Sequence, residues 1–205
     1  MKYGYVPVFR VPSGPWKVDA SWDDAYFDSA KTIVQGVVEG HLRPAIEGVA
    51  GVYLFRHYLE IALKYVIFHA RWLQDATTNA PKEDIEDVKN THNLDFLWQT
   101  AERECQARIP KETWESFDIE FARRMVLDFH SVDQKGIRFR YHGEKFGIDK
   151  RPEHERVPVV DHLWIDYPRL LVQMQHARDV LWAIDVYLLE SHGENAEWEA
   201  EMNSW

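Results

Sequence analysis

Residues 50–74 read AGVYLFRHYLEIALKYVIFHARWLQ, the clearest structural pattern in the chain. Apolar side chains recur along this stretch every three or four residues, which is the spacing of one face of an α-helix. The apolar positions are Val52, Phe55, Leu59, Ala62, Leu63, Val66, Ala70 and Leu73. A long helix with one apolar face needs partners that cover it, so this stretch predicts a helical bundle.

Four further segments show helical patterns, at about 21–40, 92–108, 111–130 and 168–190. Pro and Gly residues lie between several of them and mark breaks. Amphipathic helices of this length hide their apolar faces against one another. The sequence therefore predicts an all-α fold, an antiparallel bundle of about five helices.

Three segments are expected to lie outside this bundle. Residues 1–20 contain several Pro and Gly residues, which predict an extended N-terminal arm. Within residues 131–163, apolar and basic side chains alternate from Ile137 to Tyr141, which predicts a small extended or β insertion. Residues 191–205 hold four Glu and no Lys or Arg, and we expect an acidic tail there. The length fits a single domain over residues 1–205.

The composition narrows the class of protein. The 205 residues carry a net charge of −10, whereas a protein that coats a nucleic-acid duplex is basic. Cys105 is the single cysteine, which excludes an intrachain disulfide, a cysteine-based zinc site and a redox pair. No apolar run approaches the length of a membrane span, and the N-terminus does not resemble a secretory signal. We therefore expect a soluble, cytoplasmic protein with no membrane partner.

Motifs that bind metal ions or nucleotide cofactors are missing from the sequence. The ten histidines form neither the Glu-x-x-His pairs of di-iron bundles nor the His-Glu-x-x-His motif of zinc proteases. A glycine-rich phosphate loop and a nucleophile elbow are missing as well. We expect no metal site and no cofactor.

Two positions in the segment 111–130 suit the cleavage of RNA without a metal ion. Arg124 and His130 form an Arg-x5-His pair, and Arg123 precedes His130 by about two helical turns. A histidine can move protons to and from the 2′-hydroxyl of RNA, while an arginine stabilises charge on the phosphorane. The alternative is a pair of surface arginines followed by a histidine that the helix dipole favours.

Arg138, Arg140 and His142 alternate along the expected strand, so they would project from one of its faces. Such a face suits a phosphate group or an RNA backbone. It would equally well pin the strand to the bundle, through salt bridges from the arginines to acids such as Glu60. The sequence leaves both interpretations open.

Three motifs, in this order, resemble those of HEPN domains. Residues 56–64 (RHYLEIALK) resemble the Glu-x-x-x-Lys helix of that family, and residues 91–94 (THNL) resemble its Thr-His-x-Leu turn. Residues 140–142 (RYH) resemble its Arg-Tyr-Pro segment, with His in place of Pro. The resemblance covers roughly residues 25–190 and implies an antiparallel helical bundle, usually a homodimer.

The resemblance also implies a function. Many HEPN proteins are metal-independent ribonucleases of toxin–antitoxin or phage-defence systems. In such a protein His130 would be the catalytic acid or base and Arg124, or alternatively Arg123, would stabilise the phosphate, with RNA as the substrate and a cognate antitoxin as a partner. The residues expected to bind the substrate are Arg56, His92, Arg138, Arg140 and His142.

Two other classes of function stay open. Ribonucleases of the family commonly carry a polar residue after the arginine, whereas Met125 follows Arg124. This difference favours a non-catalytic protein that binds a nucleotide or a protein partner, such as a nucleotidyltransferase. The third class is a structural homodimer module, which would bury the segment from Trp198 to Trp205 at its interface.

Overall fold

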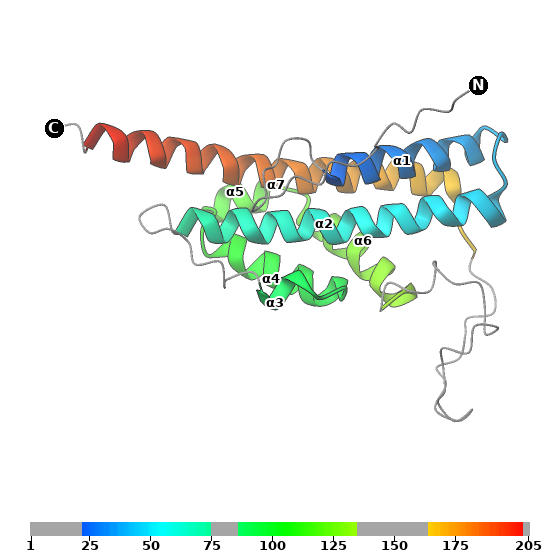
Figure 1. Ribbon diagram of the computed structural model, residues 1–205, viewed down its shortest axis with the longest axis horizontal. Helices are drawn as coiled ribbons and strands as arrows, with labels where there is room; N and C mark the ends of the chain where they lie inside the picture. Colours follow the sequence, from blue (N-terminus) through cyan, green and yellow to red (C-terminus); the bar gives the residue numbers. More distant parts are fainter. Residues whose placement is uncertain (1–21, 75–85, 135–163, 203–205) are drawn as a thin grey trace, which may run out of the picture.

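Helix α2 (Val49–Gln74) lies at the centre of the bundle and contacts α1 (Trp22–Val38), α4 (Leu94–Gln106) and α7 (Tyr167–Met202). Figure 1 shows the three long helices α1, α2 and α7 side by side, with the shorter helices on one side of them. The structure is a computed structural model, which describes residues 22–74, 86–134 and 164–202.

The shorter helices are α3 (Glu86–Lys89), α5 (Lys111–Ser116) and α6 (Ile119–Val132). A π-helical turn, η1 (Pro44–Gly48), leads directly into α2. Every element in the described part of the chain is helical, so the prediction of an all-α bundle is confirmed. The arm expected at residues 1–20 lies outside the described residues, and so do residues 135–163 of the insertion expected over 131–163. Ser131 and Val132, at the start of that expected insertion, belong to α6.

The segment that was expected to form one helix over 111–130 forms two. The backbone of Phe117 is extended, with φ −79° and ψ 149°. The carboxylate of Asp118 then caps α6 by accepting a hydrogen bond from the backbone N–H of Phe121 at 3.4 Å. The break has a physical reason, because an Asp at this position satisfies a free N–H group at the start of a new helix.

Helix α7 is longer than the sequence pattern predicted, since it ends at Met202 and not near Glu190. The acidic tail therefore continues the helix as far as Met202. Gly193 does not end the helix, because one glycine costs only about 1 kcal/mol in a helix and the Glu and Ala residues that follow it are good helix formers.

Helix α1 is antiparallel to α2, whereas α7 runs parallel to α2 (Figure 1). Where α2 and α7 begin, the Tyr167 hydroxyl of α7 donates a hydrogen bond to the backbone carbonyl of Pro44, in the turn before α2, at 2.7 Å. Gly48 makes room for this contact, because a Cβ atom there would overlap the Tyr167 ring. At the other end, His69 of α2 lies 2.6 Å from Asp185 of α7. The parallel order of α2 and α7 differs from the expected antiparallel order. The helices between them in the chain lead back to the end of the bundle at which α2 begins (Figure 1).

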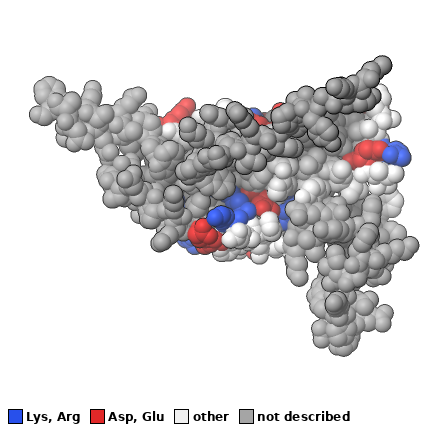
Figure 2. Space-filling view, viewed as in Figure 1, with Lys and Arg blue, Asp and Glu red and all other residues white. Residues whose placement is uncertain are grey.

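The core lies between α2 and the helices around it. The apolar face predicted for α2 is buried through Ala70, and Phe55, Leu59 and Leu63 are wholly inaccessible to solvent. On the face of the molecule seen in Figure 2, Lys and Arg side chains lie next to Asp and Glu side chains. None of the described helices is long and apolar enough to span a membrane.

We predict that Leu63→Ala lowers the free energy of unfolding by about 2–5 kcal/mol, because the deletion leaves a cavity in the core. Leu189, which is 41% exposed on α7, provides the matched control, and Leu189→Ala should change that free energy by less than about 1 kcal/mol. Urea denaturation followed by circular dichroism measures both variants. Equal losses in the two variants would contradict the placement of this face of α2 in the core.

Candidate functional site

The buried side chain of Arg56 on α2 joins three segments of the chain. Its Nη1 donates to Glu60 Oε2 at 3.2 Å, one turn further along the helix. Its Nη2 donates to the backbone carbonyl of His92 at 2.7 Å, and its Nε donates to the backbone carbonyl of Asp133 at 3.3 Å. A buried guanidinium is stable only when its charge and its donors are satisfied. Arg56 therefore holds the turn before α4 and the end of α6 against α2.

Glu60 is the carboxylate of this cluster. Its Oε1 accepts a hydrogen bond from Lys64 Nζ at 2.9 Å and lies 2.8 Å from His92 Nδ1. Burial raises the pKa of Glu60, but the hydrogen bonds and charges of Lys64 and His92 outweigh burial and hold the pKa below its ordinary value. Glu60 is therefore ionised at neutral pH, and an ionised carboxylate only accepts hydrogen bonds.

The ring of His92 lies at the protein surface, and 53% of its side chain is exposed. Because Glu60 only accepts, the hydrogen bond between them requires a proton on His92 Nδ1. In the neutral ring this leaves Nε2 as the nitrogen with a lone pair. His92 can therefore take up a proton at Nε2, and the carboxylate behind it stabilises the resulting positive charge.

The sequence around His92 shapes the turn that presents it. Thr91 Oγ1 accepts a hydrogen bond from the backbone N–H of Asn93 at 3.2 Å. The side chain of Asn93 accepts from the backbone N–H of Phe96 at 3.1 Å and so caps α4, which begins at the next residue. The motif at residues 91–94 thus combines a turn, a helix cap and an exposed imidazole.

His130 lies on α6, one turn before Asp133, whose backbone carbonyl Arg56 binds. The His130 ring is half-buried, and its Nδ1 is wholly buried with no hydrogen-bond partner among the described residues. A proton on Nδ1 would have no acceptor there. Proton transfer at Nε2 would still require that proton on Nδ1, so His130 lacks the support that Glu60 gives to His92.

Arg124 does not lie beside His130. The two residues stand six positions apart on α6, which separates their side chains by about 120° around the helix and about 9 Å along it. Arg123 lies on the same side as His130, about 20° short of two full turns. Both arginines are exposed.

The neighbours of Arg124 belong to the start of α6 and to α7. Its guanidinium lies 5.6 Å from the centre of the Phe121 ring, and that ring packs against the His176 ring at 4.4 Å between centroids. His176 Nε2 lies 2.8 Å from a carboxylate oxygen of Asp118. The hydrogen bond with His176 and the nearby charge of Arg124 both hold the pKa of Asp118 below its ordinary value.

The structure thus brings together two of the predicted site residues, Arg56 and His92, and places His130 one turn before Asp133, whose backbone carbonyl Arg56 binds. It places Arg124 elsewhere. Arg138, Arg140 and His142 lie outside the described residues. Asp133 was not among the residues predicted from the sequence, and no local signal points to it, because a lone carboxylate after a helix has no distinctive pattern.

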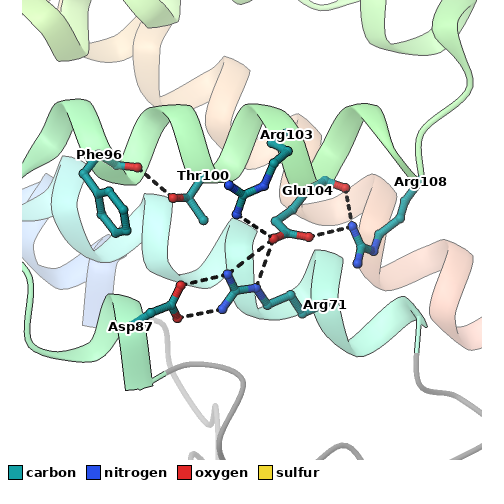
Figure 3. A network of polar contacts seen from close by, with 7 residues as sticks. All are labelled: Arg71, Asp87, Phe96, Thr100, Arg103, Glu104 and Arg108. Atoms are coloured by element: carbon teal, nitrogen blue, oxygen red, sulfur yellow. Dashed lines mark hydrogen bonds and ion pairs between the residues drawn. The ribbon is translucent and has the colours of Figure 1, made fainter.

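A second polar network joins α2, α3 and α4 (Figure 3). Arg71 donates two hydrogen bonds to the Asp87 carboxylate, at 2.8 and 3.0 Å. The carboxylate of Glu104 accepts from Arg71 at 3.3 Å, from Arg103 at 3.1 Å and from Arg108 at 2.8 Å. Each of these arginines binds a carboxylate of the same network. The network therefore holds the three helices together and is a structural feature.

The described residues support neither a reactive cysteine nor a metal site. Burial raises the pKa of the Cys105 thiol to about 12, so the thiol stays neutral and lacks the thiolate form that a nucleophile needs. Within the described ranges, no group of three or more His, Cys, Asp or Glu side chains is placed to hold a metal ion.

A scan against protein-family models gave no match, and neither did searches of curated proteins and of solved structures. The resemblance to HEPN domains therefore rests on the sequence motifs and stays a prediction.

We predict that Arg56→Met lowers the free energy of unfolding by about 3–5 kcal/mol, because it removes a buried cation from beside the Glu60 and Asp133 carboxylates and leaves the backbone carbonyls of His92 and Asp133 without their donor. The control is Arg123→Met on the exposed side of α6, for which a change within about 0.5 kcal/mol is expected. Chemical denaturation of both variants measures the difference. A loss for Arg56→Met no larger than the control's would show that the cluster does not stabilise the fold.

The lowered pKa of Glu60 also predicts a pH dependence. Because the folded-state pKa lies below the ordinary 4.5, the charged carboxylate stabilises the protein fully above that value. Its contribution is lost as the pH falls from 4.5 through the lowered pKa. The free energy of unfolding of Glu60→Gln should therefore fall less steeply with acidification than that of the wild type. Glu115→Gln, at an exposed position, should keep the wild-type slope, and a wild-type slope for Glu60→Gln would refute the prediction.

Proposed function

We propose that this protein is a HEPN-like, cytoplasmic ribonuclease of a toxin–antitoxin or phage-defence system, and that it cleaves RNA without a metal ion. The Arg56 cluster is the observation that carries the proposal. One guanidinium binds the turn that bears His92 and the end of the helix that bears His130. Imidazoles are the side chains best suited to move the protons of RNA cleavage near neutral pH.

The roles of the residues follow from the sequence motif. His130 acts as acid or base through Nε2, and Arg124 stabilises the charge on the phosphorus in the transition state. Since Arg124 and His130 point to different sides of α6, the proposal includes a homodimer in which the arginine of one copy completes the site of the other. A cognate antitoxin is the expected protein partner.

The second candidate function is binding without cleavage, to a nucleotide or to a protein partner such as a nucleotidyltransferase. The separation of Arg124 from His130 on α6 favours this candidate, because the arginine and histidine of the Arg-x5-His motif do not meet within one chain.

We predict that the wild-type protein cleaves single-stranded RNA in the presence of EDTA. His130→Ala and Arg124→Ala should each lower the rate by at least about 100-fold, which is the lower bound both for removing a general acid or base and for removing a donor that stabilises charge in the transition state. The assay follows the initial rate with a labelled RNA, using proteins of matched purity whose folding is checked by circular dichroism.

His41→Ala and Arg169→Ala serve as controls, because both side chains are exposed and stand outside the proposed site. Both should retain wild-type activity. Wild-type protein that binds the RNA but leaves it intact would favour the second candidate function. Equal cleavage by all five proteins would point to a contaminating nuclease or to another site in this protein.

A further inference from the structure

Three histidines in the described part of the chain lie within hydrogen-bond distance of a carboxylate on another element. His69 pairs with Asp185, His92 with Glu60 and His176 with Asp118. The three pairs differ in the exposure of the two partners, and this difference decides what each can do.

Only 5% of the His69 side chain is exposed, so a substrate cannot reach it. In the third pair both His176 and Asp118 are about half exposed, and neither partner is held by a buried environment. His92 alone among the three combines an exposed imidazole with a buried carboxylate, whose side chain is 3% exposed. Such a carboxylate fixes the orientation and the tautomer of the ring while the opposite nitrogen faces the substrate.

We infer that His92 is a catalytic base of the proposed ribonuclease and that Glu60 is the residue that positions it. The inference deepens the proposed function and depends on it. Glu60 is itself held from two further sides, by Lys64 Nζ at 2.9 Å and by Arg56 Nη1 at 3.2 Å. Its carboxylate therefore cannot turn away from the imidazole without losing these bonds.

The chemical step follows from the free lone pair on His92 Nε2. This nitrogen takes the proton of a ribose 2′-hydroxyl, the 2′ oxygen attacks the adjacent phosphorus, and the bond from phosphorus to the 5′ oxygen breaks. The leaving 5′ oxygen takes its proton from His130, the acid that the proposed function supplies, and a water molecule carries the proton of the His92 imidazolium back to His130. The products are a 2′,3′-cyclic phosphate and a 5′-hydroxyl, and no other reactant is consumed.

The test compares the full-length wild type with His92→Gly, Glu60→Gln and the control His41→Gly, whose ring is also exposed. RNA cleavage in EDTA is measured as kcat and KM, with and without added imidazole, after thermal melts have checked the folding. We expect His92→Gly to lower kcat by at least about 100-fold with little change in KM. Free imidazole should restore part of that loss, because it fills the space of the missing ring.

Glu60→Gln should lower kcat less, and imidazole should not restore it, since the His92 ring is still present. Wild-type kcat for His92→Gly would overturn the inference and leave the proposed function standing. Loss of activity in His92→Gly without rescue by imidazole would also overturn it and assign His92 a structural role. Absence of cleavage by the wild type would overturn the proposed function and the inference together.

Discussion

The buried guanidinium of Arg56 is the constraint on which the rest of the structure depends. A positive charge in the interior needs a countercharge and an acceptor for its donors. Glu60 supplies the countercharge from the next turn of α2, and the backbone carbonyls of His92 and Asp133 supply further acceptors. Since these carbonyls lie before α4 and at the end of α6, the apolar packing of the helices and the polar junction at Arg56 must form together.

The position of the core helix could be predicted from sequence, and its neighbours' boundaries could not. The apolar spacing along residues 50–70 is a local property, and it correctly gave the buried face of α2. The break at Asp118 escaped prediction because apolar residues continue across it, at Trp114, Phe117 and Phe121. One capping side chain decided that break, and a periodicity argument does not detect such a residue.

In the candidate site, too, some features could be predicted from the sequence and others could not. Arg56 and His92 were expected in one site because of their motifs, and the structure joins them through a hydrogen bond of 2.7 Å. The contact between Glu60 and His92 spans 32 positions and depends on the docking of the α4 turn on α2, so no local pattern encodes it. The spacing of Arg124 and His130 fitted a sequence motif, but helical rotation turns the two side chains to different sides.

The chemistry proposed for this protein rests on the tautomer of His92, which the ionised Glu60 carboxylate sets. The most direct test is nitrogen-15 NMR of the histidine rings in the wild-type protein, at a pH at which the spectrum itself shows the His92 ring to be neutral. A proton on Nδ1 of His92, with Nε2 unprotonated, is the expected result. A His92 ring protonated on Nε2, or one that exchanges evenly between the two tautomers, would contradict the role assigned to Glu60.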